Sequence, residues 1–290
     1  MPDTRMKDDD SKLVQPASQR GLTEVFRHRY LLSLLVRKEV QIRYRGSVLG
    51  WLWSYVKPLL QFVVFYFAIG VFLGMNGRVE YFPIYLLAGI TIVTFFNEAF
   101  SNGTRSLVDN AALIKKIYLP REMFPIASML IAAVNALPQI LVVMVISLFF
   151  GWRPSLLSFA AIILALVMVA ILASGLGLLF GSINVSFCDA QSFVEIIVMV
   201  AIWASPVMYE WTAVAKVVPD WLFVLYRLNP LTSAVELFHY GIWWPLGPGN
   251  ATPQPELWTF AGLALIISIV VLALGQLVFR RLEGRFAQDL

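Results

Sequence analysis

Basic side chains in the first part of the chain form a cluster that suits phosphate oxygens. The cluster comprises Arg37, Lys38, Arg43 and Arg45. An arginine guanidinium donates two parallel hydrogen bonds to a phosphate group, and a lysine ammonium binds it as a compact charge. The cluster is therefore expected to bind either the headgroups of ordinary anionic lipid or a more specific phosphate-bearing ligand.

A second basic stretch, residues 101–122, separates two apolar segments. A basic connection of this length belongs on the cytoplasmic side of a membrane. Leu107, Leu113 and Ile114 recur at helical spacing behind Ser106, which is suited to capping a helix, so a short amphipathic helix on the membrane surface is expected. That helix would either receive a soluble partner or anchor the loop to lipid. The charged candidates for contact with a partner are Arg105, Asp109, Lys115 and Lys116.

The acidic, imidazole and thiol groups do not make a catalytic set. Glu236 and His239 lie one helical turn apart, but no carboxylate pair, metal-ligand set or nucleophile triad surrounds them in the sequence. The single cysteine, Cys188, excludes an intrachain disulfide and a metal–thiolate cluster. No Gly-Lys dipeptide occurs, so the chain has no P-loop for ATP and Mg²⁺. We therefore expect no catalytic residue, no metal and no cofactor in this chain.

The composition identifies an integral membrane protein. Of the 290 residues, 59% are hydrophobic and only 14% are charged, which is too apolar for a soluble domain of this size. The formal charge of +4 does not indicate a nucleic-acid partner, because the basic residues lie in tails and loops where inner-leaflet phospholipid attracts them.

Six apolar segments have the length of a membrane-spanning helix. They are residues 51–73, 81–100, 123–150, 156–180, 193–209 and 258–279, within a transmembrane domain of residues 49–280. Residues 1–20 are expected to be a disordered cytoplasmic tail, residues 21–48 an amphipathic helix in the membrane interface, and residues 281–290 a second cytoplasmic tail. Glycines 175, 177 and 181 should let the fourth span approach a neighbouring helix closely. The expected fold is an all-α integral membrane protein with both termini in the cytoplasm.

Residues 217–244 are apolar but interrupted by polar residues. The interrupting residues are Arg227, Asn229, Pro230, Glu236 and His239. A seventh crossing here would put the basic C-terminal end outside, against the positive-inside rule. We therefore expect two short helices, broken at Asn229-Pro230, that enter the membrane from the outer face and return. Broken backbone at that depth requires surrounding protein or a water-filled cavity, so the hairpin is expected to be an outer gate.

Four blocks of sequence carry a resemblance to a known family. In order they are RKEVQIRYRGSVLGWLWSYVKPL (residues 37–59), LIKKIYLPREMFPIAS (113–128), NVSFCDAQSFVEIIVMVAIWASPVMY (184–209) and LNPLTSAVELF (228–238). They resemble the membrane subunit of type 2 ATP-binding-cassette exporters, in the branch that exports lipid-linked polysaccharides such as O-antigen, teichoic acid or galactan. Cys188 and His239 stand where the family usually has arginine.

The resemblance implies a transport subunit of the bacterial plasma membrane. Two such chains would work with two copies of a separate ATPase, which binds ATP and Mg²⁺ and docks on residues 101–122 and on the N-terminal interface helix. The exported substrate would be a polyprenyl-pyrophosphate-linked polysaccharide, of galactan type in our reading, whose pyrophosphate meets the basic cluster of residues 37–45. Aromatic faces suit a sliding sugar chain, and the preferred channel residues are Tyr66, Phe95, Phe96 and Trp203. The alternatives are a drug or lipid exporter of the same superfamily and a membrane-embedded glycosyl- or acyltransferase.

Overall fold

The structure, a computed structural model, describes residues 21–44, 52–116, 119–187, 189–247, 249 and 253–286. Within these residues all regular structure is helical. The α-helices are α1 (Leu22–Arg27), α2 (Arg29–Tyr44), α3 (Trp53–Phe65), α4 (Phe82–Asp109), α5 (Ala111–Lys116), α6 (Met123–Phe149), α7 (Leu156–Ser186), α8 (Ala190–Ala201), α9 (Trp211–Ala215), α10 (Asp220–Leu228), α11 (Pro230–Ile242) and α12 (Leu257–Leu282). The remaining helical turns are the π-helix η3 (Tyr66–Phe72) and the 3₁₀ turns η4 (Met75–Gly77), η5 (Trp244–Leu246) and η6 (Glu283–Arg285).

Five helices in the described part of the chain are long and apolar enough to cross a membrane. They are Trp53–Phe72 (α3 with η3), Phe82–Asp109, Met123–Phe149, Leu156–Ser186 and Leu257–Leu282. The all-helical membrane fold expected from the sequence is therefore present. The expected span 193–209 differs: α8 has only 12 residues, about 18 Å at 1.5 Å per residue, against a hydrocarbon core of about 30 Å.

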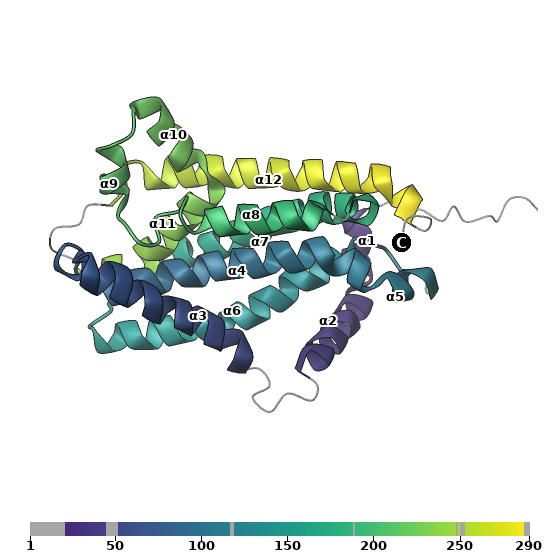
Figure 1. Cartoon of the computed structure of the whole chain (residues 1–290), viewed down its shortest axis with the longest axis horizontal. Coiled ribbons are helices and arrows are strands. Elements are labelled where there is room, and N and C mark those ends of the chain that lie inside the picture. Colours follow the sequence, from purple (N-terminus) through teal and green to yellow (C-terminus); the bar gives the residue numbers. More distant parts are fainter. Residues whose placement is uncertain are drawn as a thin grey trace, which may run out of the picture.

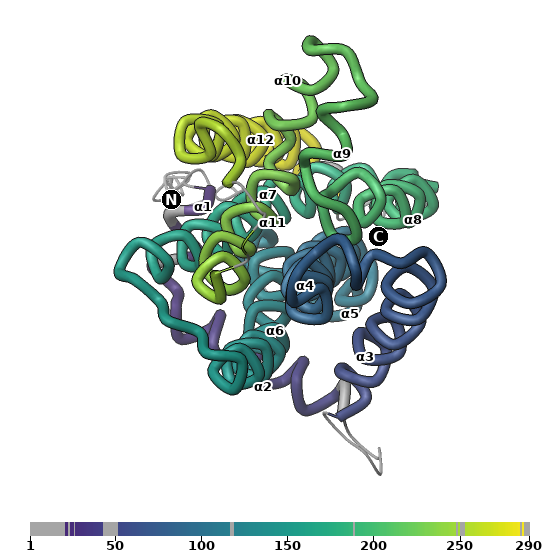
Figure 2. Tube along the Cα trace, turned by 90° about the vertical axis from the view of Figure 1, so that its left-hand side faces the viewer, coloured from purple at the N-terminus to yellow at the C-terminus, as the bar shows by residue number. Residues whose placement is uncertain are grey.

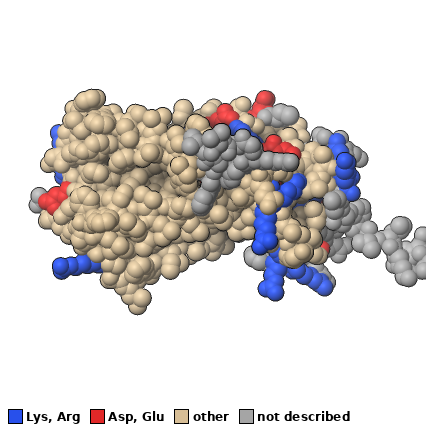
Figure 3. Space-filling view, turned by 90° about the horizontal axis from the view of Figure 1, so that it is seen from below, with Lys and Arg blue, Asp and Glu red and all other residues tan. Residues whose placement is uncertain are grey.

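The long helices form one bundle around α7. Helix α7 packs against α4 on one side and α12 on the other, and α6 packs along α4 (Figures 1 and 2). The short helix α11 packs against α7, α4 and α12 at one end of the bundle. We call the end with α1, α2, α5 and the last turn of α12 the basic end, and the end with α9, α10 and α11 the gate end. The basic end carries most of the Lys and Arg side chains visible in Figure 3.

Glycines explain how closely α7 meets its neighbours, as the sequence predicted. A Cβ atom on Gly175 would lie 2.6 Å from the backbone nitrogen of Leu272 in α12, and one on Gly275 would overlap the carbonyl oxygen of Gly175. On the α4 side, Gly177 faces Gly103. A side chain at Gly175 or Gly275 would force the α7 and α12 backbones apart, whereas a Cβ on Gly177 would stand 3.4 Å from the Cα atom of Gly103, at ordinary contact distance.

The second basic stretch differs from its prediction. The helix expected to end at residue 100 continues to Asp109, so residues 101–109 extend α4, and only α5 is a separate short helix. Ser106 caps nothing; its hydroxyl donates to the carbonyl of Gly103 at 2.7 Å within α4. The helix continues because residues 101–109 contain no proline and their one glycine, Gly103, is held in the helix by its contact with α7.

Candidate functional site

The gate end contains a segment of unwound backbone, residues 202–209, between α8 and α9. The segment is largely buried: Ser205 and Val207 are fully enclosed. Its carbonyl groups, which a helix would have satisfied, accept hydrogen bonds from side chains instead. The Tyr85 hydroxyl of α4 lies 2.9 Å from the Pro206 oxygen and 2.8 Å from the Tyr209 oxygen. Thr232 of α11 donates to Ala204 at 3.3 Å.

This unwound segment corrects the expected span 193–209. Non-helical backbone at membrane depth persists only where protein satisfies its polar groups, and here α4 and α11 do so. The segment connects α8, which begins near the basic end, to α9 at the gate end (Figure 1). It therefore forms a joint between α4, α8 and α11 whose geometry depends on a few side-chain hydrogen bonds.

The gate hairpin consists of two helices, as the sequence predicted. Helix α10 ends at Leu228 and α11 begins at Pro230, with Asn229 between them. The Asn229 side chain caps α11 by accepting from the Leu231 amide at 3.1 Å. Proline at the first helical position costs nothing, because its missing N–H would have had no partner within the helix. The two residues from which the break was predicted, Asn229 and Pro230, are therefore the ones at which α11 begins.

Arginine 227 fixes α10 to α12 rather than facing water. Its guanidinium stands 3.6 Å from the centroid of the Phe260 ring and donates to the carbonyl of Pro255. A cation over an aromatic face is attracted to the negative face of the ring. The basic residue of the hairpin is thus used to dock the hairpin on the bundle.

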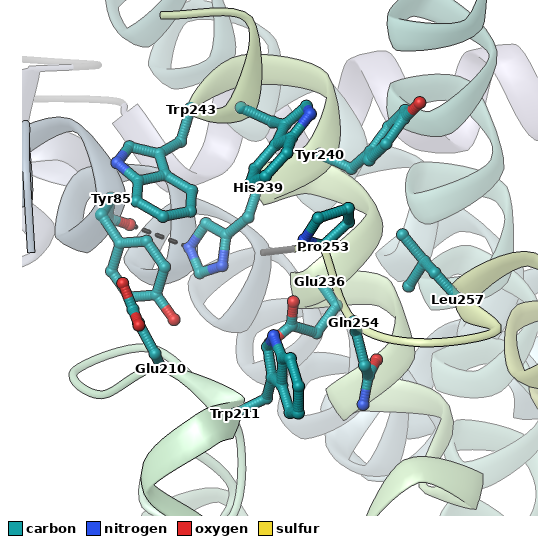
Figure 4. A pocket seen from close by; sticks show the side chains of 11 residues that line it. Tyr85, Glu210, Trp211, Glu236, His239, Tyr240, Trp243, Pro253, Gln254 and Leu257 are labelled. Atoms are coloured by element: carbon teal, nitrogen blue, oxygen red, sulfur yellow. Dashed lines mark hydrogen bonds between the residues drawn. The ribbon is translucent and has the colours of Figure 1, made fainter. Parts of the chain in front are cut away.

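Glu236 and His239 lie in a small pocket between α11, α4 and the segment before α12 (Figure 4). The His239 ring stacks on Tyr85 with centroids 3.8 Å apart, and its Nε2 lies 2.9 Å from the Tyr85 carbonyl oxygen. The Glu236 Oε1, His239 Nδ1 and Gln254 Nε2 atoms are buried and have no hydrogen-bond partner among the described residues. Aromatic rings, including Trp211 and Trp243, complete the lining.

The pocket is small, and its lining is mostly aromatic and apolar with a few polar groups. Among the described residues no group of three His, Cys, Asp or Glu side chains could hold a metal ion. Three unpaired polar atoms around a narrow space suit water or a single hydroxyl group.

At the basic end, the Pro120-Arg121-Glu122 sequence joins the start of α6 to the end of α12. The Arg121 guanidinium donates to the carbonyl of Glu283 and lies 5.7 Å from the centroid of the Phe286 ring. Glu122 is fully buried and accepts from the Gln276 side chain at 3.0 Å. These contacts connect residues 101–122 to α12 through one compact cluster.

Glu283 is a buried carboxyl group within that cluster. Its pKa is raised to about 7, chiefly by burial and also by the neighbouring Glu122 carboxylate, while Arg121 and Arg280 act in the opposite direction. The cluster rests on a second hydrophobic core, separate from the main one. That core contains Val25, Leu35, Leu107, Met123, Phe124, Ala127, Leu178, Val185, Phe279 and Phe286.

The residues predicted to receive an ATPase are divided between surface and core. Asp109, Lys115 and Lys116 are exposed, and Leu113 and Ile114 are half-buried against the second core. Leu107 is fully buried in that core, so it supports the surface without forming part of it. Arg105 pairs with Glu195 of α8 at 2.9 Å, with both side chains substantially exposed.

The four predicted channel aromatics do not share one surface. Phe95 and Phe96 are each 3% exposed within the main core, so they line no open path in this chain. Trp203 is 58% exposed and meets the edge of Phe65 at 6.2 Å. Tyr66 begins the π-helix η3 directly after Phe65, so Tyr66 and Trp203 lie near the same edge of the bundle.

The structure describes only part of the predicted phosphate cluster. Arg37 and Lys38 are exposed on α2. Arg45 lies outside the described residues, and so does the side chain of Arg43.

Sequence reasoning missed Tyr85, Gln254 and the contacts of Arg121. The only signal for Arg121 was its Pro-Arg-Glu context, which carries no information about the partner it reaches.

Comparison with known proteins agrees with this architecture. A family model described as "ABC-2 type transporter" matches residues 30–243. An "O-antigen export system permease protein RfbA" of Klebsiella pneumoniae is 26% identical over 268 residues, covering 90% of this chain and 96% of that protein. A protein of the same description from Myxococcus xanthus is 24% identical, covering 93% of this chain and 99% of that protein. The "Polysialic acid transport protein KpsM" of Escherichia coli is 23% identical, covering 84% and 91%. Because the family match spans well over half of the sequence, this chain belongs to the ABC-2 type transporter family and is a membrane transport subunit rather than an enzyme.

Proposed function

We propose that this chain is the permease subunit of an ATP-driven exporter that moves a polyprenyl-pyrophosphate-linked polysaccharide out of the cytoplasm. The observation that carries the proposal is the end-to-end similarity to polysaccharide permeases, which covers 84% to 93% of this chain in three relatives. The sequence contains no P-loop, so the energy must come from a separate ATPase subunit.

The proposed assembly is two permease chains with two ATPase chains. The ATPase would dock on the exposed part of the basic end, chiefly Asp109, Lys115 and Lys116. A push there would reach α12 through the contacts of Arg121 and Glu122. Movement of α12 would in turn reach α10, because Arg227 of α10 is docked on Phe260 of α12.

We further propose six crossings, with both termini in the cytoplasm. The unwound segment 202–209 would complete the crossing that α8 begins, because its carbonyls are satisfied by Tyr85 and Thr232. Helices α10 and α11 would then be a hairpin that enters the membrane from the outer face, and Asn229-Pro230 would lie at its tip. The lipid pyrophosphate would meet the exposed Arg37 and Lys38 on α2.

Cysteine labelling in whole cells tests this topology. In a Cys188→Ser background, a cysteine replacing Lys116 should react only after the membrane is made permeable, and one replacing Val217, which is 84% exposed, should react in intact cells. Reaction at residue 116 in intact cells would refute the orientation, whatever the substrate.

Depletion of the chain in its host tests the substrate. The proposal predicts that one polyprenyl-linked glycan accumulates on the cytoplasmic side while its surface form disappears. An O-antigen-type, galactan or teichoic-acid polymer would each agree with the proposal, and the polymer that accumulates identifies the substrate. Normal surface display of every envelope glycan, or stimulation of the assembled complex by small amphiphiles alone, would reject it.

A further inference from the structure

One side of α12 lines an open groove that ends at a pair of arginines. The α12 residues that line it recur at intervals of three and four, which puts them on a single helix face. They are Ile269, Leu272, Ala273, Gln276, Leu277, Arg280 and Arg281. Leu22 at the start of α1 forms the opposite wall. Figure 2 shows α1 beside α12.

The dimensions of this groove match one leaflet of a bilayer. The apolar part runs from Ile269 to Leu277, a rise of about 12 Å, against about 15 Å for half of the hydrocarbon core. Arg280 and Arg281 follow within one turn, at the level expected for headgroups on the cytoplasmic side. Both arginine side chains are exposed, whereas the nearby carboxyl groups of Glu122 and Glu283 are buried.

We propose that this groove binds one anionic phospholipid of the inner leaflet. Its phosphate lies on Arg281 and Arg280, and one acyl chain follows the stripe from Leu277 to Ile269 against Leu22. Arg281 is the main phosphate ligand, because Arg280 also acts on the carboxyl of Glu283. Charge complementarity selects the headgroup, and the apolar wall selects a lipid over a soluble phosphate.

The bound lipid would hold α1 against α12 at the basic end. Gly21 supports this close approach, because a Cβ there would meet the Gln276 side chain at 2.7 Å. The Gln276 Oε1 atom is buried without a partner among the described residues, and hydration at the headgroup level would satisfy it. This inference concerns lipid binding by the resting protein and does not depend on which substrate is exported.

Lipid titration of the full-length permease with its ATPase partner, followed by native mass spectrometry, tests the proposal. Phosphatidylglycerol should bind in preference to phosphatidylcholine, with one tightly held molecule per chain. Since each basic residue near an anionic lipid contributes about fivefold in affinity, R280Q/R281Q should weaken this binding roughly 30-fold. R153Q/K216Q removes the same charge from exposed positions just before α7 and just after α9, far from the groove, and should leave it unchanged.

A second measurement locates the lipid. A fluorophore on Ala273→Cys, in the Cys188→Ser background, should be quenched by brominated phosphatidylglycerol at lower mole fraction than by brominated phosphatidylcholine. Equal binding of the two phospholipids, or equal affinity of R280Q/R281Q and wild type, would overturn the proposal. Binding of polyprenyl phosphate but of no phospholipid would also overturn it. Absence of quenching by every brominated lipid would overturn it as well, since another part of the chain would then fill the groove.

Discussion

Substitution of Gly275 by alanine tests the packing that holds α7 and α12 together. The added methyl group would overlap the carbonyl oxygen of Gly175, and backbone on both sides prevents it from turning away. Overpacking of this kind costs about 1–3 kcal/mol, and the higher helix propensity of alanine returns about 1 kcal/mol. The difference is a net loss of about 0–2 kcal/mol, and we expect the upper half of this range because α7 is fixed on its far side by α4 and cannot move away.

Gly262→Ala is the matched control for this prediction. Gly262 lies in the same helix, and a Cβ there meets nothing within 4 Å, so the gain in helix propensity should act alone. Thermal melting of both variants in one detergent should show Gly275→Ala several degrees below wild type and Gly262→Ala at or slightly above it. Equal melting temperatures would show that the two helices are not in the contact described.

Three further substitutions test the two ends of the bundle. The pKa of Glu283 is raised, chiefly by burial, to about 7, so the protonated carboxyl favours the folded protein and stability should fall as pH rises from about 4.5 to about 7. Glu283→Gln should remove this pH dependence in thermal melts at pH 5 and pH 8. The same pH dependence in the variant and in wild type would refute the assignment. Asn229→Ala removes the cap of α11 and should cost about 1 kcal/mol in thermal unfolding, whereas no change would mean that the cap is not formed. Tyr85→Phe removes the one hydroxyl donor that the Pro206 and Tyr209 carbonyls share, so it should speed amide exchange in residues 202–209 while leaving α7 protected. Exchange changed equally in both regions would contradict the joint.

The sequence predicted those features that depend on local chemistry. Asn229 and Pro230 identify a helix break because one caps a helix and the other suits its first position, and both act that way here. The glycines of α7 indicate close approach because only a missing side chain permits it. Neither prediction required knowledge of a distant residue.

The features that the sequence did not predict depend on distant partners. Residues 193–209 are as apolar as a helical span, and the unwound second half accepts hydrogen bonds from Tyr85 and Thr232, which are remote in sequence. The inward face of α4 could not be identified either, because hydropathy does not distinguish a core phenylalanine such as Phe95 from a channel-lining one. Arg121 has its partner at the far end of the chain, so its role appeared only in three dimensions.

The most direct test of the whole account is reconstitution of the permease in proteoliposomes with and without its ATPase. The account predicts that the permease alone hydrolyses no ATP, and that the complete assembly moves a polyprenyl-pyrophosphate-linked glycan across the bilayer only when ATP is supplied. ATP hydrolysis by the isolated chain, or an assembly that hydrolyses ATP but moves no lipid-linked glycan, would contradict it.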